Sequence, residues 1–301
     1  MRMMTKKLAA IEAGGTKFMC TIGDSSGEIF LQVRIPTTTP EETIKKCVEF
    51  FHNSHEEIEA FGIASFGPID LDKKSPTWGY ITTTPKPGWQ NADLVGGFKS
   101  EFDVPFGFDT DVNGAALGEY KWGAAQGLDS IIYLTIGTGV GGGLLSNGTL
   151  AHGMLHPEMG HIILPLHEAD IEQEYFGSCP FHKGCLEGLV CGPAIEKRYG
   201  QPSHELDEDH KAWDLISEYV AQALHNFVCI ASPQKIIVGG GVTERSAVLP
   251  LVRTKLTKSL NGYVKTNTIE NMEEYVVVPG LGNQSGSKGA LALAERALLE
   301  A

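Results

Sequence analysis

Three short apolar runs, each bounded by turn-forming residues, open the chain. They predict strands at residues 8–12, 18–22 and 28–34. A Gly-Gly pair separates the first two runs, and Asp24-Ser25-Ser26-Gly27 separates the last two. Because short turns of this kind reverse the chain direction, the pattern predicts an antiparallel meander.

Helical and strand-like segments alternate after the meander. The pattern predicts a helix at 40–51, a buried strand at 60–64, a strand at 104–108 and a buried helix at 112–122. The strand at 104–108 would carry Thr110 and Asp111 at its carboxyl end. Ligand sites in α/β sheets collect at such ends, so we expect functional residues there.

The opening pattern returns near the middle of the chain. A strand at 130–136, a glycine-rich turn at 137–143 and a returning strand at 144–146 repeat the order strand, glycine turn, strand. An amphipathic helix at 213–229, a strand running into glycines at 236–242 and an Ala-rich helix at 286–299 follow. Such an internal repeat predicts two similarly built α/β lobes with a ligand cleft between them. The predicted lobes are residues 1–113, closed by the C-terminal helix at about 286–301, and residues 114–285.

The glycine-rich segments suggest the ligand. Residues 12–17 (EAGGTK) and 137–143 (GTGVGGG) both contain Thr, and 236–242 is a third strand that ends in glycines. Without side chains, the backbone can approach a polyphosphate closely, and its N–H groups and the Thr hydroxyls then donate to the phosphate oxygens. One such segment alone could be only a tight turn, but the three together predict that the chain binds ATP.

The net charge and the lengths of the apolar runs argue against nucleic-acid and membrane partners. The 301 residues have a formal net charge of −13 and no basic stripe, which argues against a nucleic-acid surface. No apolar run is long enough to span a bilayer, and residues 1–7 lack a signal-peptide core. We therefore expect a cytoplasmic protein that binds neither nucleic acid nor membrane.

Transfer of a phosphoryl group to a hydroxyl requires a base and hydrogen-bonding partners for the acceptor. Asp111 is the candidate base, and Asn113 can bond a sugar hydroxyl. Asp is also a common helix cap, so both interpretations of Asp111 stay open. Glu158, between His156 and His161, can accept two neighbouring hydroxyls of a polyol. His156 itself is more simply a core or surface histidine.

A cysteine and histidine cluster predicts a metal site. Cys179, His182 and Cys185 have the spacing Cys-x2-His-x2-Cys, which offers three zinc ligands in a short loop. His161 is the natural fourth ligand, and a closed site of four protein ligands would be structural. Glu187 follows the loop directly, so the metal would also fix a further carboxylate.

Taken together, these motifs resemble those of the ROK sugar kinases (repressor, open reading frame, kinase), specifically the zinc-containing bacterial fructokinases. The resemblance rests on residues 12–17, 65–70, 110–113, 137–143, 156–161 and 179–193. It implies an actin-like ATPase fold of two ribonuclease-H-like lobes, with ATP and Mg²⁺ in the cleft, and a homodimer. It also implies phosphorylation of the 6-hydroxyl of a hexose, which for fructose gives fructose 6-phosphate.

The resemblance assigns roles to individual residues. It implies Asp111 as the base; Asn113, Glu158, His161 and Glu187 at the sugar; Zn²⁺ on His161, Cys179, His182 and Cys185; the phosphates of ATP on Gly14, Gly15, Thr16, Lys17, Thr138 and Gly139; and the adenine on Gly240 and Gly241. A zinc-bound imidazole has only one ring nitrogen left, so we assign His161 to zinc first.

Two residues depart from the wider family. Many of its sugar kinases have Asp and Asn at the positions of Glu12 and Thr110, and both departures resemble the fructokinase branch. Thr110 is therefore expected in the substrate pocket, where it weakens a glucokinase assignment. The segment 84–89 is expected to form a rim over the sugar.

Two alternatives come from the same family. One is a kinase for glucose, mannose or N-acetylmannosamine, which the motifs do not separate from a fructokinase. The other is a sugar-responsive DNA-binding regulator. Such a regulator would carry a helix-turn-helix before the first glycine segment, and about ten residues leave no room for one.

Overall fold

The computed structural model describes residues 7–301 and divides them into two compact units. Unit 1 contains the chain up to Gln126, residues 152–156 and residues 280–301, and unit 2 contains residues 127–151 and 157–279. Residues 1–6, part of the segment predicted to lack a signal-peptide core, lie outside the described residues. Within residues 7–301, no helix is both long and apolar enough to cross a bilayer.

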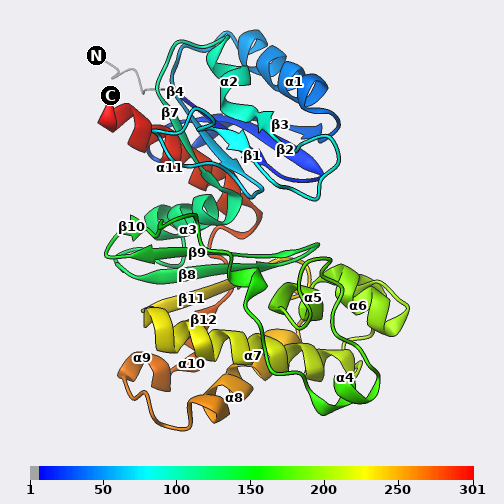
Figure 1. Cartoon of the computed structure of the whole chain (residues 1–301). Helices are drawn as coiled ribbons and strands as arrows, with labels where there is room; N and C mark the ends of the chain where they lie inside the picture. Colours follow the sequence, from blue (N-terminus) through cyan, green and yellow to red (C-terminus); the bar gives the residue numbers. More distant parts are fainter. Residues whose placement is uncertain (1–6) are drawn as a thin grey trace. The chain divides into compact units, whose positions relative to one another are not determined.

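Unit 1 is built on a five-stranded sheet with the strand order β3-β2-β1-β4-β7 (Figure 1). Its strands are β1 (Lys7–Ala13), β2 (Lys17–Gly23), β3 (Ile29–Pro36), β4 (Ile58–Ser65) and β7 (Phe106–Thr110). β1, β2 and β3 pair antiparallel, whereas β4 runs parallel to β1 and β7 parallel to β4. The predicted meander and the α/β alternation after it are both confirmed.

Helices cover the two faces of this sheet. They are α1 (Pro40–Asn53), α2 (Leu94–Lys99), α3 (Asp111–Trp122) and α11 (Ser285–Glu300). α11 packs along β1, β4 and β7, while α1 and α2 lie on the opposite face (Figure 1). α1 starts where the sequence dictates, because the Thr39 side chain accepts a hydrogen bond from the Glu42 N–H and Pro40 occupies the first turn.

α3 belongs to unit 1 because it packs tightly against α11. A Cβ at Gly289 would lie 1.8 Å from the Gly114 carbonyl oxygen, so the two backbones touch where they cross. The buried Glu119 carboxylate also accepts hydrogen bonds from the Gly280 N–H at 2.9 Å and the Ser285 hydroxyl at 2.7 Å. The first unit boundary therefore follows Gln126, whereas the sequence analysis placed it after residue 113.

Unit 2 repeats the topology of unit 1. Its sheet has the order β10-β9-β8-β11-β12, with strands β8 (Ile131–Ile136), β9 (Val140–Ser146), β10 (Thr149–Leu150), β11 (Lys235–Gly239) and β12 (Val276–Val277). β8, β9 and β10 are antiparallel, and β11 and β12 run parallel to β8. Each unit thus has the same five-stranded plan, which confirms the repeat predicted from the sequence.

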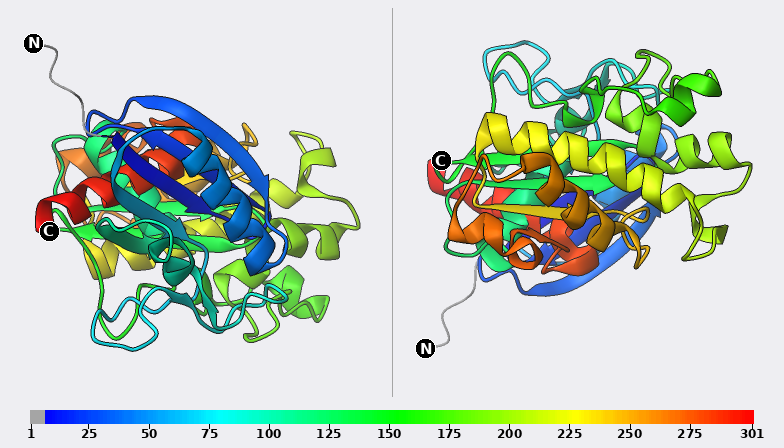
Figure 2. Two further views of the ribbon diagram at one scale, coloured as in Figure 1. Left: turned by 90° about the horizontal axis from the view of Figure 1, so that it is seen from above. Right: turned by 90° about the horizontal axis from the view of Figure 1, so that it is seen from below.

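One long helix organises the core of unit 2. α7 (Ala212–Ala231) lies across the sheet and packs beside α8 (Val248–Leu260) (Figure 2). The shorter elements are α4 (Glu168–Glu172), α5 (Leu186–Val190), α6 (Gly192–Tyr199), α9 (Asn267–Glu270) and α10 (Met272–Tyr275), with 3₁₀ turns η1 (Met159–His161) and η2 (Ser203–Glu205). The buried side chains of α7 include Trp213, Ile216, Tyr219 and Leu224, which join the buried residues of β8 and β11.

The glycines at 141–143 lie inside β9 rather than in the predicted turn, which spans only 137–139. Close packing of η1 explains their presence in a strand. A Cβ at Gly142 would lie 2.5 Å from the Met159 sulfur, and a Cβ at Gly160 would lie 2.0 Å from the Val140 carbonyl oxygen. The absent side chains let η1 sit directly on β9, which places Glu158 and His161.

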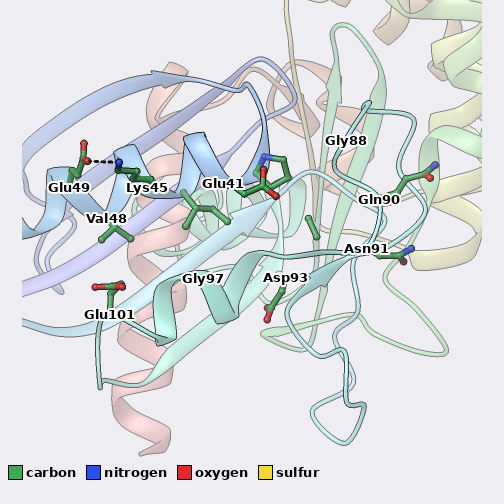
Figure 3. Close-up of a pocket in the computed structure, with 13 residues that line it drawn as sticks. Glu41, Lys45, Val48, Glu49, Gly88, Gln90, Asn91, Asp93, Gly97 and Glu101 are labelled. Carbon is green, nitrogen blue, oxygen red and sulfur yellow. Dashed lines mark ion pairs between the residues drawn. The ribbon is translucent and has the colours of Figure 1, made fainter.

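A cavity of about 730 Å³ opens on unit 1 between α1, the segment 88–93 and the end of α2 (Figure 3). Its lining carries more acidic than basic side chains: Glu41, Glu49, Asp93 and Glu101 against Lys45. None of the residues assigned to ATP, sugar or metal lines this cavity.

Candidate functional site

The turn between β1 and β2 is a tight hairpin with an open outer side. The Gly14 N–H donates to the Lys17 carbonyl at 2.9 Å, and the Thr37 hydroxyl donates to the Gly14 carbonyl at 2.7 Å. Thr16 and Lys17 are exposed, and a Cβ at Gly15 would meet no atom within 4 Å. The hydrogen bonds at Gly14 therefore fix the hairpin, while residues 15–17 stay accessible. Phosphate binding by the backbone requires both properties.

Glu12 precedes this hairpin and reaches α11. The Ser287 hydroxyl donates to the Glu12 carboxylate at 2.9 Å, and a Cβ at Gly286 would lie 2.4 Å from the carboxyl carbon. Burial raises the pKa of Glu12, while the Ser287 hydrogen bond and the Lys17 charge oppose the rise. Glu fits here because Gly286 leaves room for it.

Thr110, not Asp111, caps α3. The Thr110 hydroxyl oxygen accepts from the Asn113 N–H at 3.1 Å, while the half-buried Asp111 accepts from the neighbouring Val112 N–H at 2.9 Å. The cap interpretation of Asp111 is therefore wrong. Its role as a base stays a prediction, and Thr110 has a structural role that the sequence analysis did not assign to it.

Two residues that the sequence analysis missed join this group. The His152 ring lies with its Nε2 2.8 Å from Asp109 Oδ2, and the Asn113 side-chain amide donates to Asp109 Oδ1 at 2.7 Å. The hydrogen bond from Asp109 raises the pKa of His152, and partial burial opposes that rise. The position of Asp109 near the carboxyl end of a predicted strand could have marked it as a candidate, but the sequence contains no sign that His152 reaches it.

His156 is a core histidine, as the simpler interpretation held. It is 5 % exposed, and its Nε2 accepts from the Ile69 backbone N–H at 3.2 Å. Together with His152, it attaches the segment 152–156 to the rest of unit 1.

The segment 84–89 was expected to form an exposed rim, but its two end residues are buried. Thr84 and Trp89 are buried, and the Trp89 indole N–H donates to the Thr38 carbonyl at 2.8 Å. Trp89 also packs against Phe18, with ring centroids 5.4 Å apart. Only the residues between these two anchors are available at the surface.

In unit 2, the residues predicted to bind nucleotide follow two adjacent strands. The hairpin after β8 is closed by the Gly137 N–H, which donates to the Gly139 carbonyl at 2.9 Å, and Thr138 is exposed at its tip. After β11, Gly240 has φ +93°, and a Cβ there would lie 2.5 Å from the Ile136 carbonyl oxygen. Since β8 and β11 are parallel neighbours, the structure brings these two glycine turns together.

Two carboxylates of unit 2 lie near the β8–β9 hairpin. Glu187, in the first turn of α5, accepts from the Val140 backbone N–H at 2.9 Å. Desolvation and the negative charge of Glu187 raise the pKa of Glu158. The structure therefore groups the two acids that were predicted to bind the sugar.

The predicted zinc ligands also come together. One ligand atom each from His161, Cys179, His182 and Cys185 lies within 4.8 Å of all the others. Cys179 Sγ lies 3.6 Å from His182 Nδ1, close to the roughly 3.5 Å that separates neighbouring ligands around a tetrahedral zinc. His161 Nδ1 is buried without a hydrogen-bond partner among residues 7–301. Both the donor set and the unpaired nitrogen fit a zinc ion.

Backbone contacts hold this cluster to α5. Cys185 is the N-cap of α5, and its sulfur accepts from the Gly188 N–H at 3.4 Å. The Leu186 N–H donates to the Ile162 carbonyl at 3.0 Å, and the Ser178 N–H donates to the Gly188 carbonyl at 2.8 Å. The cysteine loop and the segment after His161 are thus joined at the start of one short helix.

The two repeated sheets and the glycine hairpin after the first strand of each define an actin-like ATPase fold. The chain belongs to the ROK family, whose model matches residues 8–297. It is 46% identical over 295 residues to a fructokinase of Zymomonas mobilis, covering 96% of each chain. It is 44% identical over 294 residues to a fructokinase of Streptococcus mutans, covering 97% of this chain and 99% of the relative. The crystal structure of a ROK hexokinase from Thermus thermophilus has a TM-score of 0.81 and 25% identity, covering 98% of this chain and 100% of that one.

Proposed function

We propose that this protein is an ATP-dependent fructokinase that transfers the γ-phosphoryl group of ATP to the 6-hydroxyl of fructose. The observation that carries the proposal is the similarity of almost the whole chain, at 44% and 46% identity, to proteins that are named fructokinases. Asp111, a carboxylate at the start of α3 that does not serve as the helix cap, supports it.

Asp111 is proposed as the base. Phosphoryl transfer has a loose transition state, so the protein mainly positions the acceptor, and the proton leaves the 6-hydroxyl late. Asp111 orients this hydroxyl and accepts its proton. Asn113, Glu158, Glu187 and Thr110 are the proposed sugar-binding residues.

The glycine hairpins are proposed to hold ATP. Unit 1 contributes Gly14, Gly15, Thr16 and Lys17 to the phosphates, and unit 2 contributes Thr138 and Gly139 to the phosphates and Gly240 and Gly241 to the adenine. The open faces of both hairpins and their exposed Thr16 and Thr138 support these roles. Mg²⁺, when bound with ATP, supplies positive charge that offsets the charge developing on the phosphoryl oxygens.

Zinc is proposed as a structural metal held by His161, Cys179, His182 and Cys185. Four protein ligands would leave no open position for water, so such a site stabilises the loop and has no direct part in catalysis. Bound in this way, the metal would fix His161 and, through α5, Glu187.

We also propose a homodimer located in the cytoplasm, with a hexose and ATP as ligands and no nucleic-acid partner. The net charge of −13 supports the last point, since a phosphate backbone needs clustered Lys and Arg. Light scattering coupled to size-exclusion chromatography tests the dimer, because a mass near the chain mass of 32.5 kDa would contradict it.

The main alternative is a kinase for another hexose, since the solved relative from Thermus thermophilus is a hexokinase. The test is ATP-dependent phosphorylation of fructose, mannose, glucose and N-acetylmannosamine with Mg²⁺, compared as ratios of kcat/KM. A preference for fructose supports the proposal. A preference for an aldose would keep the kinase mechanism but overturn the substrate, and no turnover of any hexose would overturn both.

A further inference from the structure

Asp109 accepts hydrogen bonds on both carboxylate oxygens, although it is almost fully buried. Oδ1 accepts from the Asn113 side-chain amide at 2.7 Å and from the Thr110 backbone N–H at 2.8 Å. Oδ2 lies 2.8 Å from Nε2 of His152, whose side chain is 39% exposed. All four residues belong to unit 1, and the His152 ring arrives from 43 positions along the chain.

This arrangement decides which way the Asn113 amide faces. An ionised carboxylate only accepts hydrogen bonds, so the NH₂ group of Asn113 must point at Asp109. The amide oxygen of Asn113 then points away from it. That oxygen is buried, and it has no hydrogen-bond partner among residues 7–301.

A buried acceptor without a partner costs free energy, and a hydroxyl that reaches it recovers that loss. A site built in this way strongly rejects a ligand that lacks the hydroxyl. The side-chain amide of Asn113 therefore suits one hydroxyl group of a polyol, provided that its orientation is maintained.

We propose that Asp109 and His152 are positioning residues for the sugar: they hold the Asn113 amide so that its oxygen accepts a hydrogen bond from one sugar hydroxyl. The inference rests on the proposed hexose kinase function and extends it to two further residues. His152 acts through its N–H, which occupies the second carboxylate oxygen of Asp109. The same carboxylate holds the Thr110 N–H, so it also fixes the start of α3 beside Asp111.

Substitutions at His152 test the first step. His152→Leu removes the donor, whereas His152→Gln keeps an N–H group that can reach Asp109. Because the side chain is partly exposed, neither change should unfold the protein, and circular dichroism and a thermal melt check this. We expect the KM for fructose to rise by up to roughly tenfold in His152→Leu, the scale of one lost neutral hydrogen bond between Asn113 and the sugar. His152→Gln should stay near wild type, and the KM for ATP should not change in either variant.

Deoxy sugars test the second step. Asp109→Asn lets residue 109 donate as well as accept, so the Asn113 amide is no longer fixed. The loss of kcat/KM in this variant is measured with fructose and with each monodeoxyfructose that keeps its 6-hydroxyl. We expect the loss to disappear for one analogue, the one without the hydroxyl that Asn113 binds, and to persist for the others.

The outcomes separate the inference from the function on which it rests. If the wild-type protein phosphorylates a hexose but His152→Leu leaves its KM unchanged, the inference is wrong and the function stands. An equal loss in His152→Gln and His152→Leu, or an equal loss for every deoxy analogue with Asp109→Asn, also overturns the inference. A wild-type protein that phosphorylates no hexose overturns the function and the inference together.

Discussion

The Glu187 carboxylate accepts a hydrogen bond from the Val140 backbone N–H at 2.9 Å, which ties the first turn of α5 to the first residue of β9. The next helix, α6, is tied to the same hairpin by its first residue, because the Gly192 N–H donates to the Gly137 carbonyl at 2.7 Å. Cys185, the cap of α5, is also one of the four clustered metal-type ligands. Within unit 2, one short helix therefore links the metal cluster to the β8–β9 hairpin.

Two substitutions of Glu187 should separate its role as the acceptor for the Val140 N–H from the role of its charge in sugar binding. Glu187→Ala removes the acceptor for the Val140 N–H, so we expect the hairpin to loosen and the KM for ATP to rise roughly fivefold to tenfold. Glu187→Gln keeps an acceptor oxygen but loses the charge, so it should raise the KM for the sugar and leave the KM for ATP near wild type. Steady-state kinetics with each substrate varied in turn measures both. Equal values of the KM for ATP in the wild type and Glu187→Ala would contradict the link.

Removing a metal ligand should release zinc and destabilise unit 2. Cys179→Ser leaves three ligands, and metal affinity contributes to folding free energy, so we expect less than one zinc per chain and a melting temperature lower by several degrees. Elemental analysis and a thermal melt measure these changes. Cys229→Ser is the matched control, because Cys229 is exposed on α7 and lies outside the cluster. A Cys179→Ser protein that kept its zinc and its stability would rule out a structural metal site.

Much of the architecture could be predicted because it follows from local pattern. Short apolar runs and glycine turns gave the meander of each unit, and the Cys-x2-His-x2-Cys spacing identified three members of the metal cluster. The features that the sequence did not predict depend instead on contacts between residues far apart in the chain. Gly142, for example, lies within β9, where the side chain of Met159, many positions away, occupies the place that a Cβ would take. The sequence likewise contains no signal that His152 reaches Asp109, since only tertiary packing brings that pair together.

Asp111→Ala should remove nearly all turnover and spare ATP binding. A positioned general base contributes about 10²–10⁴-fold to the rate, so kcat should fall by at least about 100-fold. Because Thr110 caps α3, the melting temperature should change little. Single-turnover assays measure the rate, and calorimetry measures ATP affinity. Appreciable remaining kcat would exclude Asp111 as the base, and lost ATP binding would point to a wider defect.

The His152–Asp109 pair should make stability depend on pH. The hydrogen bond to Asp109 raises the pKa of His152, while partial burial and the positive charge of Arg296 oppose the rise. Because the folded pKa exceeds the unfolded one, this contribution is fully present below about pH 6.5 and is lost as pH rises through the folded pKa. The melting temperature of wild type minus that of His152→Gln should therefore be largest near pH 5.5 and shrink above neutrality. A difference that does not vary with pH would show that the pair does not titrate in this range.

Gly142→Ala should lower stability, whereas Gly15→Ala should weaken ATP binding without lowering stability. A Cβ at Gly142 would lie 2.5 Å from the Met159 sulfur, so Gly142→Ala must displace η1 and should cost about 1–3 kcal/mol of unfolding free energy. A Cβ at Gly15 would meet no atom within 4 Å, so Gly15→Ala should fold normally. If the backbone of the β1–β2 hairpin contacts phosphate, however, the added methyl group should raise the KM for ATP severalfold. Denaturant melts and ATP-dependent kinetics on both variants measure the contrast. A Gly15→Ala enzyme with an unchanged KM for ATP would remove that hairpin from the phosphate site.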